Sequence, residues 1–278
     1  MLRNFIVPTN PTALIYLWPC LVMAQNHKQP NLTFQTDFFH AVNHWVVLPK
    51  KPSDSQYLYG YLYFDPNKGM RFVLENTLSF DGTWQLNRAT KTYVLQKSMQ
   101  DPTLQVALIP KAIRKQWNLP KIPATLSPKL DIDSAEYCTA LANYYNHQEQ
   151  SSLAVPLLKK ALQKNPTHPQ LLFELGYAYN AMARYKKAIR VLEALTQKHP
   201  AQKAWQELGY AYLQTKQISI GEHCYSKAVG MCESREAIQT IGRELHAVLL
   251  NLRAFSYLEK WEMIAKKGEI PSVSEAEN

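Results

Sequence analysis

A spacing of leucine, small and aromatic residues recurs through the second half of this 278-residue chain. Gly176, Gly209 and Gly242 mark successive copies, each about 33 residues after the one before. A period of this length is typical of solenoids built from stacked pairs of antiparallel helices, which bind partners along a groove. The recurring positions are Leu141, Ala142, Tyr145, Ala154, Leu158, Ala161 and Pro166, then Leu175, Gly176, Tyr179, Ala188, Leu192 and Pro200, then Trp205, Leu208, Gly209, Tyr212, Gly221, Tyr225 and Ala228.

The offsets within each copy have a physical meaning. Leu175 and Tyr179 are four residues apart, so they share one face of a first helix and pack on its partner. Gly176 and Gly209 let the two helices of a pair approach closely, because a side chain there would hold them apart. Proline such as Pro200 cannot continue a helix and therefore marks the join between copies.

This pattern resembles the tetratricopeptide repeat, in which Trp, Leu, Gly and Tyr precede Ala and Pro at fixed distances. The resemblance implies three full repeats, at about 135–168, 169–201 and 202–235, and a degenerate fourth at 236–267. The fourth copy has no helix breaker around 249–251, so it forms either a hairpin or one long capping helix. In both forms it covers the apolar end of the stack, which a solenoid needs in order to be soluble.

Residues 25–117 have a different composition, rich in Tyr, Phe, Val and Thr, with turn residues at short intervals. This composition is typical of antiparallel strands. Within 57–64 tyrosines alternate with Leu, Gly and Phe, so the two sets face opposite sides of a sheet. The predicted fold class is α+β, with a small antiparallel β domain ahead of an α-α superhelical solenoid. Turns are expected at 65–69 and 81–82, and further strands at 44–48, 70–74, 92–96 and 104–109.

The segments that flank the solenoid are also predicted from composition. Prolines within 118–130 indicate a stiff linker between the domains, and the solenoid then occupies 131–267. Asp133 or Ser134 is the expected N-cap of its first helix. Residues 268–278 are polar and acidic without periodicity and are expected to form a flexible tail.

Residues 1–24 have the features of an export signal. Arg3 supplies a positive charge, and 12–24 form a mostly apolar run that is too short to span a bilayer. Val22-Met23-Ala24 before Gln25 fits a cleavage site. Prolines interrupt the apolar run, so an uncleaved anchor and an unusual cytosolic N-terminus remain as alternatives. The expected location is periplasmic or associated with a bacterial cell envelope.

The positive charge of the chain is local. Residues 25–130 hold 13 Lys and Arg against 6 Asp and Glu, whereas 131–278 hold 17 against 16. If any part contacts an anionic envelope polymer or lipid surface, it is therefore the β domain. The alternative is a basic composition with no specific ligand. Nucleic acid is not an expected partner, because no stacking-and-basic motif is present and export would separate the protein from it.

Motifs of catalysis and metal binding are missing from the sequence. It has no G-x-S-x-G elbow, no H-E-x-x-H pair and no phosphate-binding glycine loop followed by Lys. Cys138, Cys224 and Cys232 have no paired or metal-ligand spacing, so they are expected to be buried thiols. The chain is predicted not to be an enzyme and to need no cofactor or metal.

The resemblance also implies which residues line the groove, because particular positions of each first helix do so throughout the family. One use of such grooves is a clamp of Lys, Asn and Arg on a peptide's terminal carboxylate. Asn143 and Lys203 match that clamp, but Glu174 and Glu207 occupy positions where amide or basic groups are needed, and they would repel a carboxylate. The partner-binding groove residues are predicted to be Asn143, Asn146, Phe173, Tyr177, Asn180, Lys203, Gln206 and Tyr210.

The function expected from these features is a non-enzymatic adaptor or scaffold of the bacterial cell envelope, whose groove binds an extended peptide or protein partner. Amides suit the backbone of such a peptide, and tyrosines offer it flat apolar contact. The alternative is a module that binds an anionic glycan or lipid through the basic β domain. Ordinary solvated residues would give the same groove composition.

Overall fold

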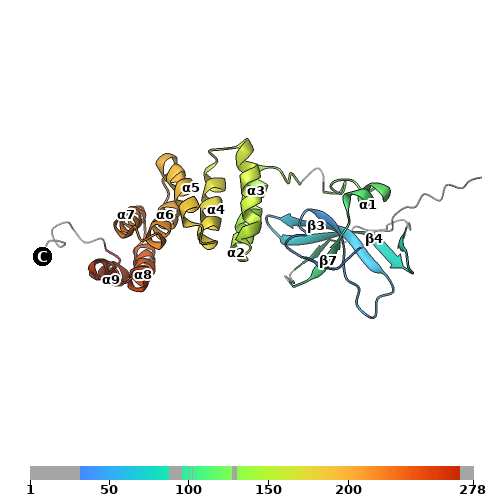
Figure 1. Cartoon of the computed structure of the whole chain (residues 1–278), viewed down its shortest axis with the longest axis horizontal. Helices are drawn as coiled ribbons and strands as arrows, with labels where there is room; N and C mark the ends of the chain where they lie inside the picture. Colours follow the sequence, from blue (N-terminus) through green and yellow to red (C-terminus); the bar gives the residue numbers. More distant parts are fainter. Residues whose placement is uncertain (1–31, 88–95, 100, 102, 127–129, 270–278) are drawn as a thin grey trace, which may run out of the picture.

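The computed structural model describes residues 32–269, apart from 88–95, 100, 102 and 127–129. The molecule is elongated, with a β domain at one end and pairs of helices extending from it (Figure 1). The expected export signal (1–24), the predicted strand at 92–96 except its last residue, and the tail beyond 269 lie outside the described residues. Within the described ranges, none of the helices combines the length and apolar character needed to cross a membrane.

The N-terminal region forms an antiparallel sheet with the order β1-β7-β2-β3-β4-β5, and β6 pairs with β4. The long central hairpin turns at Asp65–Gly69, where Gly69 has a φ of 70° that favours glycine. This sheet confirms the expected antiparallel β region. Its strands are β1 (Thr36–Asp37), β2 (His44–Val47), β3 (Tyr57–Asp65), β4 (Gly69–Phe80), β5 (Trp84–Leu86), β6 (Gln96–Ser98) and β7 (Gln105–Leu108).

The alternation in β3 gives the sheet two different buried faces. Tyr59, Tyr61 and Tyr63 pack with Trp45 and the aliphatic residues of one core. Leu62 and Phe64 belong to the other core, which continues into the helices. Both faces of the sheet are therefore covered, one within the domain and the other toward the solenoid.

The tyrosine face is covered by a short helix and the chain that follows it. Helix α1 (Lys111–Gln116) places Ile113 in this core, and Leu126 is also buried there. The Trp45 indole donates a hydrogen bond to the Pro120 carbonyl oxygen at 2.8 Å. Residues 118–126, which the prolines predict to be part of a linker, thus pack on the sheet.

The C-terminal region forms four helical hairpins, and three of them match the expected full repeats. Ser134 is the N-cap of the first helix, and its Oγ accepts a hydrogen bond from the Tyr137 amide at 3.1 Å. The helices are α2 (Ala135–His147), α3 (Ser151–Lys164), α4 (Pro169–Ala181), α5 (Tyr185–Lys198), α6 (Gln202–Gln214), α7 (Ile218–Val229), α8 (Arg235–Asn251) and α9 (Leu258–Lys267), with a 3₁₀ turn at Phe255–Tyr257 before α9.

The repeat glycines lie where the paired helices approach each other. A Cβ atom on Gly209 would lie 2.6 Å from the Tyr225 ring and 2.9 Å from the Gly221 carbonyl oxygen. A Cβ atom on Gly176 would clash with Leu192. The predicted close approach at these positions is confirmed.

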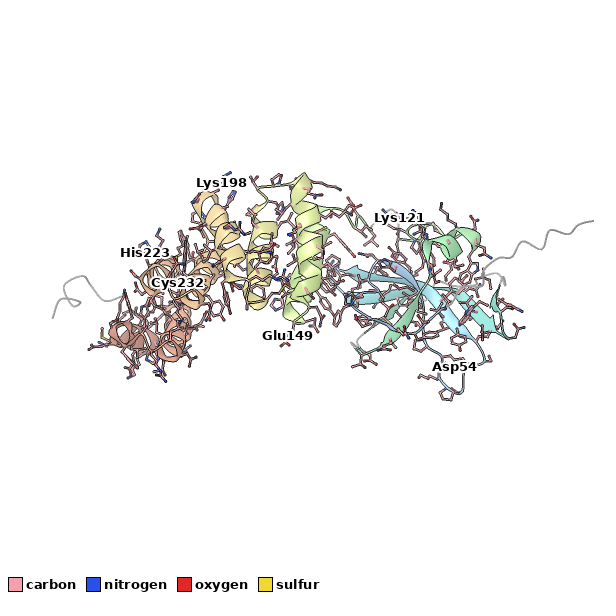
Figure 2. All side chains as sticks on the ribbon, viewed as in Figure 1. Asp54, Lys121, Glu149, Lys198, His223 and Cys232 are labelled. Atoms are coloured by element: carbon pink, nitrogen blue, oxygen red, sulfur yellow. The ribbon has the colours of Figure 1, made fainter. Side chains whose placement is uncertain are left out.

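All four hairpins use the same turn, in which a non-glycine residue adopts a left-handed conformation. These residues are Glu149, Ala183, Lys216 and Arg253, with φ between 54° and 63°. The next backbone amide in each turn bonds back to the first helix, as from Ala254 to Leu249 at 2.9 Å. The fourth repeat is therefore a hairpin, not one long helix. Figure 2 shows Glu149, at the first turn, and Lys198, at the end of α5, on opposite edges of the solenoid.

The β domain covers the first helix pair of the stack. Phe64 packs against Tyr137 and Tyr144, with ring centroids 6.2 and 5.3 Å apart. The Tyr137 hydroxyl donates to Asn43 Oδ1 at 2.7 Å, and the Tyr145 hydroxyl donates to the Phe39 carbonyl oxygen at 3.0 Å. The sheet thus closes one end of the solenoid.

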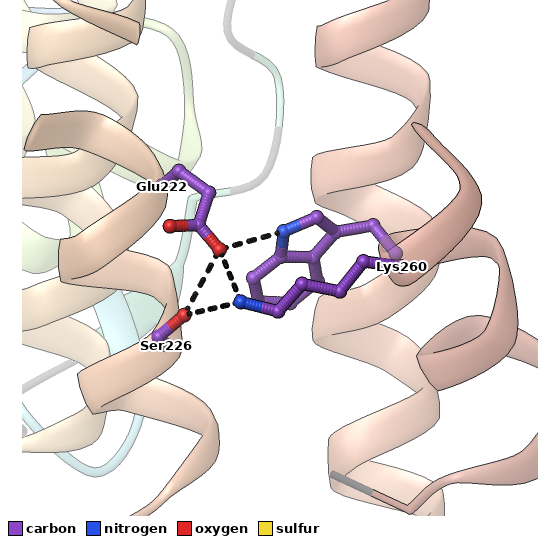
Figure 3. Close-up of polar contacts among 4 residues, drawn as sticks. Glu222, Ser226 and Lys260 are labelled. Atoms are coloured by element: carbon purple, nitrogen blue, oxygen red, sulfur yellow. Dashed lines mark hydrogen bonds and ion pairs between the residues drawn. The ribbon is translucent and has the colours of Figure 1, made fainter. Parts of the chain in front are cut away.

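The fourth hairpin closes the other end. Trp261 on α9 is fully buried and donates through Nε1 to Glu222 on α7 at 3.1 Å (Figure 3). The Lys260 ammonium contacts the same carboxylate oxygen at 2.6 Å, and Ser226 Oγ donates to it at 3.1 Å. One acidic side chain of the third repeat thus holds three groups together.

Candidate groove site

A pocket of about 280 Å³ lies along the first helices of the four repeats. Helices α2, α4, α6 and α8 all contribute to it, so it forms only when the repeats stack. We call it the groove pocket. It is lined by Asn143, Asn146, His147, Phe173, Glu174, Tyr177, Lys203, Gln206, Glu207 and Glu244.

Two amides of the first repeat hold Glu174. Asn143 Nδ2 donates to its Oε1 at 2.9 Å, and Asn146 Nδ2 donates to its Oε2 at 2.8 Å. Asn146 Nδ2 also bonds to the Glu174 carbonyl oxygen at 3.2 Å. Both carboxylate oxygens therefore accept hydrogen bonds from the first repeat, and the residue is only 6% exposed.

The same contact recurs one repeat later with fewer donors. Asn180 Nδ2 donates to both the carbonyl oxygen and Oε2 of Glu207, each at 2.8 Å. Asn146 and Asn180 occupy equivalent positions on α2 and α4. In the described part of the chain the Oδ1 atoms of both asparagines are buried and accept no hydrogen bond.

The third acidic residue comes from the degenerate repeat. Glu244 on α8 accepts hydrogen bonds from Gln206 Nε2 at 3.1 Å and from the Tyr225 hydroxyl at 2.9 Å. Three glutamates, one from each of three repeats, therefore line the pocket. We call Glu174, Glu207 and Glu244 the groove carboxylates.

The groove carboxylates affect one another electrostatically. Burial raises the pKa of the Glu207 carboxyl above its usual value, and the charges of Glu244 and Glu174 act in the same direction. The hydrogen bond from Asn180 opposes this effect in part. Burial, together with Glu207 and Glu174, also raises the pKa of Tyr177. The pocket is thus a region of negative potential.

The structure brings six of the eight predicted groove residues into this pocket: Asn143, Asn146, Phe173, Tyr177, Lys203 and Gln206. The other two lie outside its lining. Asn180 is buried beneath Glu207, and Tyr210 packs edge-on against Tyr185, with ring centroids 6.1 Å apart. The acidic character of the pocket was missed as a binding feature.

Glu174 and Glu207 stand out in the sequence as acids at positions of the carboxylate clamp, but their amide partners could not be inferred. No feature of the sequence indicated that Glu244 faces the groove. Its counterparts 33 and 66 residues earlier, Ala211 and Ala178, are buried and apolar. Spacing therefore gave no reason to place a charged group there.

Cysteine and metal chemistry do not add a second site among the described residues. Cys138 and Cys224 are buried free thiols and Cys232 is half-buried. Burial raises the pKa of the Cys224 thiol to about 11, which keeps it protonated. No group of three or more His, Cys, Asp or Glu side chains in the described ranges is placed to hold a metal ion.

The comparison with protein families places a known repeat in the solenoid. Models of the tetratricopeptide repeat match residues 147–218 and 202–235. The chain therefore contains tetratricopeptide repeats from the end of α2 to the start of α8. No curated protein matches the chain at a significant level.

Solved structures similar to this chain include other repeat proteins. MamA, in the structure "MamA MSR-1 C2", is 26% identical over 37% of this chain and 59% of its own, with a TM-score of 0.33. PilF of Pseudomonas aeruginosa is 19% identical over 52% and 65%, with a TM-score of 0.42. The Sgt2 repeat domain of Aspergillus fumigatus is 23% identical over 49% and 85%, with a TM-score of 0.37. The chain thus spans about three fifths of the MamA chain.

Proposed function

We propose that this protein is a non-enzymatic scaffold that holds an extended segment of a protein partner in the groove pocket and along its flanks. The observation that carries the proposal is the pocket itself, which collects side chains from four successive first helices. Tetratricopeptide solenoids use such surfaces for protein partners. Phe173 and Tyr177 offer flat apolar contact, while Asn143 and Gln206 offer polar groups at the same surface.

The location proposed for this scaffold is outside the cytoplasm, in a bacterial envelope. The support is the sequence of residues 1–24, with Arg3, the apolar run and the cleavage-site pattern before Gln25. N-terminal sequencing of the protein purified from its native cells is the test. A chain that begins at Gln25 is expected, and an intact Met1 would contradict export by cleavage.

The groove is tested by site-specific photo-crosslinking in the full chain. A benzophenone amino acid at Tyr177 is expected to crosslink to one short, contiguous segment of a partner, identified by mass spectrometry. The matched position is Lys186, which is exposed on α5 outside the pocket lining. It is expected to give no such product. A third position, Lys50 in the β domain, tests the alternative function, which is binding of an anionic glycan or lipid through that domain.

Each outcome of that experiment decides between the two sites. A crosslink from Tyr177 that Asn143→Ala weakens supports the groove. A crosslink from Lys50 alone, to a glycan or lipid, would instead favour binding through the basic β domain. The full chain is needed for the comparison, because separating the halves would expose Phe39 and Phe64, which pack against α2.

A further inference from the structure

The groove pocket has negative charge that the protein does not neutralise. In the described part of the chain, no ion pair reaches any of the groove carboxylates. Lys203 is the one Lys or Arg among the ten lining residues, and its side chain is exposed rather than paired. A partner that brings a positive charge would therefore meet carboxylates without an existing counterion.

One residue that lines the pocket has a buried hydrogen-bond acceptor that is not used. Asn146 lines the pocket and is only 5% exposed, and its Oδ1 has no hydrogen-bond partner in the described structure. Its Nδ2 is committed to Glu174, so the amide cannot turn over without losing that bond. A ligand with N–H donors would supply what this oxygen lacks.

Size and shape narrow the class of ligand. At about 280 Å³ the pocket lies below the usual range for small-molecule sites, which is roughly 300–1,000 Å³. It is suited to one side chain of a larger partner. Phe173 and Tyr177 are four residues apart on α4, so their rings line the pocket from one helix face. Aromatic rings attract a cation placed over them.

From these observations we infer that the groove pocket receives an arginine side chain from the bound segment of the partner protein. A guanidinium group has five N–H donors in one plane and stacks on aromatic rings, so it matches the groove carboxylates, Asn146 Oδ1 and Tyr177 together. A lysine ammonium offers three donors around a point charge and matches this flat arrangement less well. The inference rests on the proposed function, because it names the chemistry of the segment that the groove holds.

The state of the free protein is consistent with this ligand. Burial raises the pKa of Glu207, and repulsion by the other two groove carboxylates adds to this effect. A bound cation would remove the repulsion. An acidic or C-terminal carboxylate ligand would increase it.

The test begins with peptides selected from a randomised 12-residue display library against the full-length protein. The strongest peptide is synthesised with its N-terminus acetylated and its C-terminus amidated, and its affinity is measured by fluorescence anisotropy. A second version replaces the arginine by citrulline, which keeps the shape but removes the charge. We expect the citrulline peptide to bind at least tenfold more weakly.

The protein variants remove the charge of the pocket with little change of shape. Glu207→Gln combined with Glu244→Gln is expected to lower the affinity for the arginine peptide about tenfold and to leave the affinity for the citrulline peptide unchanged. Glu174→Gln is avoided, because its amide would face the Nδ2 donor of Asn143 or Asn146, whereas at Glu244 the new amide can face the Tyr225 hydroxyl, which accepts as well as donates. The matched control is Glu149→Gln with Glu233→Gln, which removes two exposed charges outside the pocket. It is expected to change neither affinity.

The outcomes separate this inference from the proposed function. If selected peptides lose affinity with Tyr177→Ala but contain no arginine, or bind equally well with citrulline, the groove binds peptides and the arginine inference is wrong. If no peptide is selected, or if Tyr177→Ala changes no affinity, the proposed groove function fails and the inference fails with it. Urea denaturation of every variant confirms that each remains folded.

Discussion

The ends of the repeat stack and the groove between them treat buried polar groups in opposite ways. At the β-domain end the hydroxyls of Tyr137 and Tyr145 both donate hydrogen bonds, and at the other end the Trp261 indole does the same. In and beneath the groove, Asn146 Oδ1 and Asn180 Oδ1 accept no hydrogen bond from the described residues, and none of the ion pairs among those residues involves a groove carboxylate. The buried polar groups at the ends are thus satisfied within the fold, whereas two buried amide oxygens at the groove are not.

This contrast predicts whether a substitution in each region raises or lowers the stability of the protein. Changes at the ends of the stack remove satisfied contacts, so they should destabilise the protein. A change that removes one of the groove carboxylates, which have no counterion among the described residues, should stabilise it. Natural proteins commonly carry such a conflict between stability and function at their sites.

The largest effect is expected for Trp261→Ala at the α9 end. This residue is fully buried and also donates to Glu222, so its truncation leaves a cavity and removes one of the three groups that contact this carboxylate oxygen. The free energy of unfolding should fall by about 3–5 kcal/mol, measured by urea denaturation. Phe255→Ala is the control in the same repeat, because Phe255 is 66% exposed and its loss should cost little. Equal effects of the two changes would mean that α9 does not close the stack.

The next effect is expected in the middle of the stack, for Gly209→Leu. A Cβ atom there already lies 2.6 Å from the Tyr225 ring, so a larger side chain forces α6 and α7 apart. The expected cost is about 1–3 kcal/mol, and the loss should spread to neighbouring repeats because the stack is short. Gly230→Ala is the control, since its Cβ would meet its nearest atom at an ordinary 3.5 Å. An unchanged thermal midpoint for Gly209→Leu would contradict the close approach.

These glycines also show which part of the fold was predictable from the sequence. A residue without a side chain, repeated every 33 positions, requires two helices to touch, and the helix pairs follow from that requirement. The turn of the fourth repeat was not predictable in the same way. None of the four turns uses glycine. Arg253 adopts the left-handed conformation in the fourth turn, and an arginine gives no sequence signal for this conformation, whereas a glycine would.

Contacts between residues that are far apart in the sequence were not predictable either. Pro120 lies in a segment whose prolines indicate a linker, yet its carbonyl oxygen accepts a hydrogen bond from Trp45, which is distant in sequence. The Asn–Glu contacts of the groove likewise join side chains of successive repeats. The resemblance to tetratricopeptide repeats implied that Asn146 and Phe173 face the groove, but it carries no information about which donor meets which acceptor. Such pairing depends on the stacking angle of the helices, and that angle is set by the whole core.

A smaller effect is expected for Tyr137→Phe at the β-domain end. The change keeps the ring contact with Phe64 and removes the hydrogen bond to Asn43 Oδ1. The expected cost is about 1 kcal/mol in urea denaturation, because a half-buried acceptor loses its donor. Tyr257→Phe is the control, since no hydrogen bond joins its hydroxyl to the described part of the protein. A Tyr137→Phe variant as stable as the wild type would mean that the hydrogen bond to Asn43 does not help to hold the sheet on α2.

The smallest effect, and the one of opposite sign, is expected for Glu207→Gln in the groove. Burial and the neighbouring carboxylates raise the pKa of Glu207 in the folded state above its value in the unfolded chain. The folded protein therefore holds this proton more tightly, so its stability is greatest below the ordinary glutamate pKa and is lost as the pH rises through the raised value. Glutamine cannot ionise but can still accept the hydrogen bond from Asn180. The variant should consequently melt at a higher temperature than the wild type at pH 7, and the difference should shrink as the pH is lowered to about 4.

Glu149→Gln, which removes an exposed charge at the first turn, should show no such pH-dependent gain. A Glu207→Gln variant that is less stable at pH 7 would mean that this carboxylate serves the fold rather than a ligand, and the contrast between the ends and the groove would not hold.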